Sequence, residues 1–351
     1  MLSFCFLIIT HLIDISNKLN IIIRDVHING MGGDLMVMDK KREEIIKLLP
    51  QELRKLFTKS EIDFTRLQEI RLRVNMPLIV IYNAKEYFIS RNGKMTEQIS
   101  EACRITCSQI KEAMVYISNY SRYAFEEEIR QGFITVEGGH RVGVAGKIIW
   151  DHGKIRSITY ISFINIRISH EVIGCADSVM DYLYENENFY NTLIISPPRC
   201  GKTTLLRDIV RNVADGETGG RAMTVGIVDE RSEIGACHLG CPQNNIGCRT
   251  DVLDGCPKSE GMMMLVRSMA PEIVAVDEIG SKEDAAAIEY VMNCGINIIA
   301  TVHGLDMDEV INKPVIGELV RKRRFKRYIL LKKGMMGKVS AIFDDRGNVI
   351  Y

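Results

Sequence analysis

Two different hydrophobic patterns follow one another along the chain. Between residues 39 and 168, apolar side chains recur at helical spacing over residues 42–56 and then alternate with polar ones over residues 67–73, which is typical of a half-buried strand. Ser108 is the expected N-cap of a later helix, and Gly132 is expected to end another. The remaining strands and helices of this region are expected at residues 77–82, 86–89, 108–116, 121–131, 133–136 and 141–146. The order of elements predicts a mixed α+β domain at residues 39–168.

The pattern changes from residue 191 onward, where short apolar strands alternate with helices. Such alternation indicates βαβ units and therefore an α/β domain with a parallel sheet. The expected strands lie at residues 192–195, 224–228, 273–276 and 296–300, and the expected helices at residues 202–213, 259–269 and 281–293. A small β meander is expected at residues 328–332, 338–343 and 349–351. Residues 169–190 are expected to link the two domains.

The first residues differ from the rest of the chain. Residues 1–13 are almost entirely apolar, but they are too few to span a bilayer and lack the basic start and small-residue cleavage site of a secretory signal. We interpret residues 1–38 as an extension that is untranslated or disordered, because codons for residues 32–34 can form a ribosome-binding site just upstream of Met36 and Met38. The alternative is a short apolar helix or strand.

Composition narrows the class of protein. The chain has 351 residues, of which 46% are hydrophobic and 26% charged, so whole-chain disorder, collagen-like repeats and a coiled-coil rod are disfavoured. Lys plus Arg and Asp plus Glu both number 45, so no chain-wide field favours nucleic acid or a membrane. For the ten cysteines, the length of the chain and the lack of a recognisable signal peptide favour reduced thiols in a cytosol over disulfides. One loose group lacks a paired CxxC, which disfavours zinc: Cys237, Cys241, Cys248 and Cys256.

The strongest chemical signal is a strand, a tight loop and the sequence GKTT opening a helix, over residues 193–206. This is the context of a phosphate-binding loop, in which backbone N–H groups surround the β-phosphate. Lys202 would bridge β- and γ-oxygens, and the Thr203 hydroxyl would bind Mg²⁺. Ser196 stands where the general motif has its first glycine. The expected ATP-binding residues are Ser196, Pro197, Pro198, Arg199, Cys200, Gly201, Lys202, Thr203 and Thr204.

A second signal comes from a buried strand at residues 273–276 that ends in two carboxylates, Asp277 and Glu278. In a parallel sheet the carboxyl ends of strands face the ligand. Asp277 would hold Mg²⁺ through water, and Glu278 would act as general base on the attacking water. A kinase needs no water activation, so the acidic pair favours hydrolysis of ATP over phosphoryl transfer to a small molecule.

Other polar residues near strand ends are further catalytic candidates. Glu230 follows the strand at 224–228, and His303 closes the last parallel strand, where it could hydrogen-bond a γ-oxygen. The alternative for His303 is a structural role. Arg249 and Arg267 could supply positive charge to a neighbour's nucleotide, although surface ion pairs explain them nearly as well.

A basic cluster lies near the C-terminus. Residues 318–338 hold nine Lys or Arg and one acid, which fits contact with phosphate, anionic lipid or an acidic partner, or a solvated face. It is the one feature that supports a nucleic-acid-stimulated motor. A nucleotide-gated scaffold with little turnover is a further alternative to an ATPase.

Several segments, in order along the chain from about Lys40 to the end, resemble the stage III sporulation protein AA family. They are EIRLRVNMPL at 69–78, GGHRVGVAGK at 138–147, NIRISHEVIGCA at 165–176, SPPRCGKTTLLRD at 196–208, GIVDERSEIG at 226–235, GCRTDVLDGCPKSEGM at 247–262, PEIVAVDEIG at 271–280 and IATVHG at 299–304. That family is similar to the hexameric ATPases of bacterial secretion and pilus systems. The resemblance implies a RecA-like P-loop ATPase domain at residues 191–351.

The resemblance also implies roles and partners. Glu230 falls in an acidic box, Asp277 and Glu278 in the Walker B segment and His303 in a histidine box, although secretion ATPases have a glycine where Asp277 stands. It implies ATP and Mg²⁺ as ligands, a homo-oligomeric ring, usually a hexamer, and a role in endospore formation. The ATPase would act in the mother-cell cytoplasm, reaching the membrane peripherally through membrane-embedded channel proteins, with nucleic acid not expected.

Overall fold

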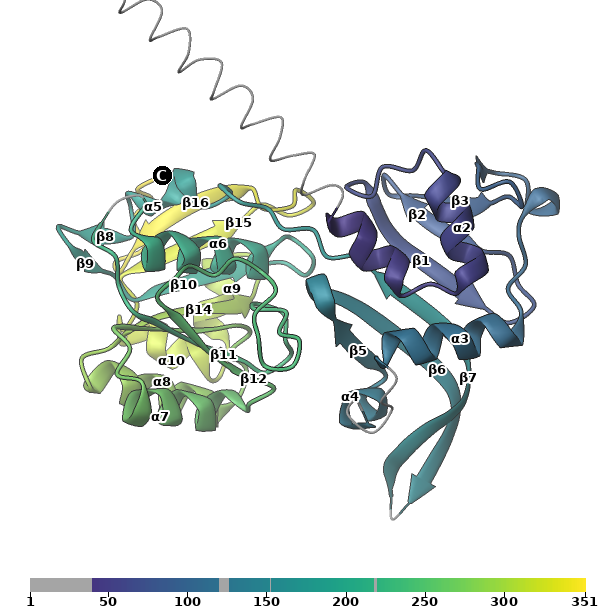
Figure 1. The fold of residues 1–351 in the computed structure, drawn as a ribbon. Coiled ribbons are helices and arrows are strands. Elements are labelled where there is room, and N and C mark those ends of the chain that lie inside the picture. The colour runs from purple at the N-terminus through teal and green to yellow at the C-terminus, as the bar shows by residue number, and fades with distance from the viewer. Residues whose placement is uncertain (1–39, 120–125, 152, 218–219) are drawn as a thin grey trace, which may run out of the picture. The chain divides into compact units, whose positions relative to one another are not determined.

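The computed structural model describes residues 40–119, 126–151, 153–217 and 220–351 (Figure 1). The chain divides into two compact units. The first contains the described residues before Thr135 together with Arg141–Ile168, and the second contains Thr135–His140 and Ser169–Tyr351. Our interpretation of residues 1–38 lies outside the described residues.

The first unit is built on a seven-stranded sheet in the order β4-β3-β2-β1-β7-β6-β5. Strand β1 (Leu67–Arg73) pairs antiparallel with β2 (Ile79–Tyr82) and β7 (Lys154–Arg167). The other strands are β3 (Lys85–Ile89), β4 (Met95–Thr96), β5 (Phe133–Val136) and β6 (His140–Asp151). The sequence pattern did not predict β7 or the outer half of β6.

Two irregularities explain why the long hairpin of β6 and β7 is hard to predict from the sequence. The β6–β7 register shifts between Ala145 and Lys147, and Tyr160 has a positive φ of 47°, so the apolar alternation changes phase along both strands. Beyond the shift, Ile149 and Trp150 are both exposed although they are neighbours in sequence. A regular period of two is therefore absent from the sequence.

The helices of the first unit differ in detail from the prediction. The prediction of a single helix at 42–56 is wrong. Residues 40–47 form one helix, and α2 (Gln51–Lys59) begins after Pro50. Pro50 has no N–H group with which to continue the first helix. Helix α3 (Cys107–Ile117) is capped by Thr106, whose side chain accepts from the Gln109 N–H, and not by Ser108. Helix α4 (Glu126–Gln131) ends at Gly132, with φ 89°; residues 121–125 of that prediction lie outside the described residues.

The second unit contains a seven-stranded sheet in the order β12-β11-β13-β14-β10-β15-β16. All neighbouring strands pair in parallel except β15 and β16, which are antiparallel. The strands are β10 (Thr192–Ser196), β11 (Val225–Asp229), β12 (Thr250–Asp254), β13 (Ile273–Val276), β14 (Asn297–His303), β15 (Arg327–Leu331) and β16 (Val339–Asp344). This is the parallel sheet that the sequence predicts. The residues expected to form a last meander strand, 349–351, make only one bridge, from Val349 to Phe343.

Helices cover both faces of this sheet (Figure 1). One hydrophobic core joins α6 (Lys202–Asp215) to residues such as Ile194 and Ala275, and the other joins α7 (Lys258–Ser268) and α8 (Lys282–Asn293) to Leu193 and Val274. Helices α9 (Met307–Asn312) and α10 (Ile316–Arg321) pack in the second core. Successive strand residues thus face opposite cores, as the two-residue period of a strand requires.

The segment that we expected to be a linker, residues 169–190, belongs to the packing of the second unit. It forms α5 (Asp177–Met180) and a small hairpin of β8 (Tyr184–Glu185) and β9 (Asn188–Phe189). Val179 and Leu183 are fully buried in the core that contains α6. The segment therefore stabilises the α/β unit.

Candidate nucleotide-binding site

The loop between β10 and α6 has the backbone shape of a phosphate-binding loop. Ser196 is buried at the end of β10, and its hydroxyl donates to the Pro197 carbonyl at 2.7 Å. Arg199 and Gly201 have positive φ values of 61° and 89°, and Gly201 directly precedes α6. The loop turns sharply and presents the N-terminus of a 14-residue helix, where unpaired N–H groups favour an anion.

The first residues of α6 reach the carboxylate that follows β13. The Lys202 ammonium lies 3.0 Å from Asp277 Oδ1, and the Thr203 hydroxyl donates to Asp277 Oδ2 at 2.6 Å. Thr301 on β14, between β10 and β13, also donates its hydroxyl to Asp277. The end of β13, a residue of β14 and the N-terminus of α6 thus meet at a single carboxylate.

The charge of Asp277 is held by its neighbours. Burial alone would raise the pKa of this carboxyl, but the Lys202 ammonium and the hydroxyl donors Thr203 and Thr301 outweigh it and lower the pKa below its usual range. Asp277 is therefore a carboxylate at neutral pH. A carboxylate and a hydroxyl side by side are hard oxygen ligands of the kind that Mg²⁺ prefers.

Glu278 occupies a strained and well-connected position. Its φ is 57°, which is unusual for a residue with a side chain, and its N–H donates to the Thr301 hydroxyl at 2.8 Å. Its carboxylate lies 3.0 Å from His303 Nε2 and 3.1 Å from Arg231 Nη1, and Lys202 lies 3.7 Å away. The backbone conformation directs this carboxylate to the same place as the Lys202 ammonium.

A second carboxylate, Asp229 at the end of β11, shapes the loop that carries Glu230 and Arg231. It is buried and accepts hydrogen bonds of 2.8–2.9 Å from the backbone N–H groups of residues 233–235. Burial nevertheless raises its pKa, against the effect of these N–H donors. Arg207 on α6 binds the carbonyls of residues 233 and 234 from the other side, at 2.6 Å each. The N–H groups of the loop are therefore held by the end of β11, and its carbonyls by α6.

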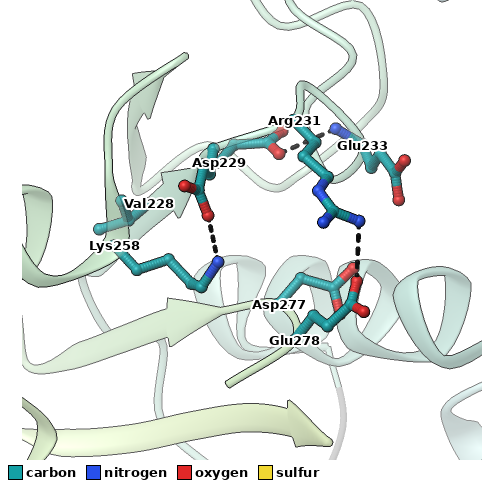
Figure 2. Close-up of a pocket in the computed structure, with 8 residues that line it drawn as sticks. Val228, Asp229, Arg231, Glu233, Lys258, Asp277 and Glu278 are labelled. Carbon is teal, nitrogen blue, oxygen red and sulfur yellow. Dashed lines mark hydrogen bonds and ion pairs between the residues drawn. The ribbon is translucent and has the colours of Figure 1, made fainter. Parts of the chain in front are cut away.

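Glu230 and Arg231 line a pocket together with Asp277 and Glu278. Figure 2 shows Arg231 extending from the loop after β11 toward Glu278, while Lys258 at the start of α7 lies across the pocket. Lys258 forms an ion pair with Glu230. The pocket therefore holds acidic and basic side chains in alternation beside the Lys202–Asp277 pair.

The structure brings most of the expected site residues together, but not the two arginines. Ser196–Thr204, Asp277, Glu278, Glu230 and His303 all lie at the carboxyl edge of the sheet. Arg249 immediately precedes β12, at the opposite edge, where it donates to the Ala214 carbonyl at the end of α6. Arg267 is exposed in the last turn of α7. This turn also lies toward the opposite edge, because the chain enters β13 there a few residues later.

Sequence reasoning overlooked three groups that organise this site. Lys258, Arg207 and the acceptor role of Asp229 carry no recognisable motif, since each acts on a loop whose conformation sequence patterns do not reveal. Lys258 could have been noticed as a cation at the start of a helix that follows a strand. Of the cysteines, Cys237 is buried and Cys241 is exposed, and among the described residues no group of three or more His, Cys, Asp or Glu side chains could hold a metal ion.

Comparison with known proteins identifies the family. Residues 39–350 match the family described as sporulation stage III, protein AA. The chain belongs to this family. Stage III sporulation protein AA of Bacillus subtilis (strain 168) is 39% identical over 309 residues, which cover 88% of this chain and 96% of that protein. The family resemblance expected from the sequence is thereby confirmed.

More distant relatives share part of the chain or its fold. Protein SEEDLING PLASTID DEVELOPMENT 1 of Arabidopsis thaliana is 31% identical over 183 residues, or 48% of this chain and 26% of that protein. The pilus retraction motor PilT with bound ADP has a TM-score of 0.52 at 13% identity, covering 80% of this chain and 76% of its own. The Yersinia pseudotuberculosis ATPase DotB has a TM-score of 0.52 at 13% identity, with 86% and 78% covered. At 13% identity, the likeness to PilT and DotB indicates a shared fold alone.

No helix among the described residues is both long enough and apolar enough to cross a membrane.

Proposed function

We propose that this protein is a Mg²⁺-dependent ATPase whose site is formed by the β10–α6 loop and the carboxyl ends of β13 and β14. The observation that carries the proposal is the joint contact of Lys202 and Thr203 with Asp277. An ammonium, a hydroxyl and a carboxylate within hydrogen-bond distance at a helix N-terminus fit the β/γ-phosphates and the metal of a nucleotide. The PilT structure, which contains ADP, supports a nucleotide at this fold.

The residues present fit Mg²⁺ and a triphosphate. Thr203 would supply a hydroxyl ligand and Asp277 would hold Mg²⁺ through water, since Mg²⁺ characteristically binds one or two protein oxygens and completes its shell with phosphate and water. Gly201 fits a loop that must approach phosphate closely, since it carries no side chain and has φ 89°. Bound Mg²⁺ would neutralise charge on the phosphate oxygens.

The roles of the chain's own groups follow from their contacts. Lys202 would exchange its contacts with Asp277 and Glu278 for phosphate oxygens, because a triphosphate carries more negative charge than a carboxylate. Glu278, released from Lys202, would accept a proton from the attacking water, with the Thr301 hydroxyl holding its backbone in the strained conformation. His303, 3.0 Å from Glu278, would orient that carboxylate and contact the γ-phosphate. The Glu230–Lys258 ion pair would form one wall of the pocket.

Hydrolysis would serve endospore formation. Family membership supports a sporulation role, and the fold shared with PilT and DotB supports a ring-forming motor, a hexamer, that energises a channel complex. We propose that the protein works from the mother-cell cytoplasm and reaches the membrane through membrane-embedded channel proteins.

Contacts within the basic run at residues 321–327 weigh against the nucleic-acid-stimulated alternative. Lys322 pairs with Glu289 at 3.0 Å and Lys326 with Asp345 at 2.7 Å. The Arg327 guanidinium lies 3.9 Å from the centre of the Tyr190 ring and donates to the Tyr182 carbonyl. Much of this charge is therefore used inside the fold, and less remains for a phosphate backbone.

A steady-state assay of phosphate release tests the proposal. The parent should hydrolyse ATP with Mg²⁺ and stop when Mg²⁺ is chelated, and Lys202→Ala should lower ATP affinity by about tenfold or more because a charge-assisted contact is lost. Lys55→Ala, which removes an exposed cation on α2, is the matched control. Large stimulation by single-stranded DNA would favour the nucleic-acid motor, and an inert parent that assembles with ATP would favour the scaffold.

A further inference from the structure

A short basic loop lies directly against the phosphate-binding loop. Residues 332–338, Lys-Lys-Gly-Met-Met-Gly-Lys, join β15 to β16, and we call them the 332–338 loop. The Gly337 N–H donates to the Cys200 carbonyl at 2.8 Å. A Cβ added to Gly201 would stand 2.8 Å from the Gly337 nitrogen and 3.4 Å from Met336 Cγ. Gly201 is needed for this approach, Gly337 has a positive φ of 68°, and the two loops touch through their backbones.

The 332–338 loop carries charge that is not used inside the fold. Lys332, Lys333 and Lys338 are all exposed. Within the part of the chain that the structure describes, none of these three ammonium groups pairs with a carboxylate. This contrasts with Lys322 and Lys326 of the preceding run, which are paired. Three unpaired cations in seven residues, with no acid among them, are suited to an anionic ligand.

The same loop also exposes apolar surface. Met336 is 79% exposed and its neighbour Met335 is 47% exposed. Methionine is a flexible, polarisable side chain that packs well on aromatic rings. The loop itself is closed, since the Lys332 N–H donates to the Lys338 carbonyl at 2.8 Å. An exposed methionine is thus presented from a closed turn beside the phosphate-binding loop.

The order of strands gives the direction in which a nucleotide would extend. The γ-phosphate would lie toward Asp277, which follows β13, on the β14 side of β10. Strand β15 pairs with β10 on its other side. With the β-phosphate held by the β10–α6 loop between them, the α-phosphate and the nucleoside would extend toward β15 and the 332–338 loop.

We infer that the 332–338 loop is the nucleoside-binding element of this site: Lys332 and Lys333 contact the α-phosphate, and Met336 covers the base. The inference rests on the proposed ATPase function. It adds the residues that bind the α-phosphate and the base, which lie away from the γ-phosphate. It makes binding of a nucleoside triphosphate stronger than binding of the bare triphosphate chain.

Equilibrium binding to the full chain tests the inference, with two probes in the presence of Mg²⁺: the non-hydrolysable analogue AMP-PNP and inorganic tripolyphosphate. Lys332→Ala/Lys333→Ala should weaken AMP-PNP about tenfold, since two charged contacts are lost. Met336→Ala should weaken AMP-PNP about fivefold and leave tripolyphosphate unchanged, because only a base packs on its side chain. Met264→Ala, at an exposed methionine of α7, and Lys55→Ala are the controls and should bind as the parent does.

The outcomes separate this inference from the proposed function. If Lys202→Ala abolishes AMP-PNP binding while both loop variants bind as the parent does, the inference is wrong and the ATP site stands. Equal weakening of both probes by Met336→Ala would overturn the assignment of the base. If Lys202→Ala itself binds AMP-PNP normally, the proposed function fails as well. Unchanged thermal unfolding of the loop variants confirms that the substituted, exposed side chains do not alter the fold.

Discussion

At the scale of single residues, Thr301 connects the two carboxylates of the candidate site. Its hydroxyl donates to Asp277 and accepts from the Glu278 N–H at 2.8 Å. Glu278 has φ 57°, so its side chain direction depends on this backbone contact. Thr301 is fully buried, and neither bond can be replaced by bulk water. A positioning role for Thr301 follows from these contacts.

Thr301→Val should therefore lower the ATP hydrolysis rate roughly ten- to hundredfold, because it keeps the side-chain shape but removes both hydrogen bonds. Thr301→Ser retains the hydroxyl and should restore most of the rate. The measurement is kcat together with KM for both variants. Because Thr301 acts through Asp277 and Glu278, a raised KM with an unchanged kcat would contradict the positioning role.

Residue chemistry was the most predictable part of the site. A GKTT sequence after an apolar strand and an Asp-Glu pair after another can be recognised because both are local in sequence, and the structure places Lys202 3.0 Å from Asp277. Lys258 and Arg207 were not predicted. Each acts on a loop from a different helix, and such long-range contacts leave no local pattern.

At the scale of elements, regular amphipathic segments were predictable and irregular ones were not. The parallel strands near residues 192–195 and 273–276 are short, apolar and bounded by turns, so their pattern is clear. Strand β12 was missed because it is a polar edge strand with no fully buried residue, and β7 because a bulge changes its phase. Pro50 ended a helix that apolar spacing alone would have continued.

The segment at residues 169–190 gives an element-scale prediction. Leu183→Ala should destabilise the α/β unit by about 2–5 kcal/mol, since a fully buried side chain of the α6 core is removed and leaves a cavity. Val172→Ala, at a position that is 49% exposed in the same segment, should change the free energy of unfolding by less than about 0.5 kcal/mol. Urea unfolding followed by circular dichroism measures both. Equal effects of the two substitutions would mean that the segment is a linker after all.

At the scale of the whole molecule, the two candidate arginines bear on assembly. Arg249 and Arg267 lie toward the sheet edge opposite the phosphate-binding loop, so neither can reach the nucleotide of its own chain. Arg249 already binds the Ala214 carbonyl. Arg267 is exposed and is the stronger candidate for contact with a neighbouring copy's nucleotide.

Sedimentation velocity with Mg²⁺ and AMP-PNP should show a species several times the mass of the chain if the protein forms the proposed ring, in which Arg267 of one copy reaches the site of the next. Arg267→Ala should then lower hydrolysis in the assembled protein, and Arg249→Ala should chiefly lower thermal stability through the loss of its contact with α6. A protein that remains monomeric with the nucleotide analogue would refute the ring.

In the proposed reaction, Glu278 activates water for attack on ATP held by Lys202 and Asp277. Single-turnover conversion of radiolabelled ATP by excess protein with Mg²⁺ tests it most directly, because binding and chemistry are seen separately. The parent should convert bound ATP to ADP, whereas Glu278→Gln should bind ATP with similar affinity and convert it about 100- to 10,000-fold more slowly. Conversion by Glu278→Gln at the parent's rate would show that Glu278 is not the general base.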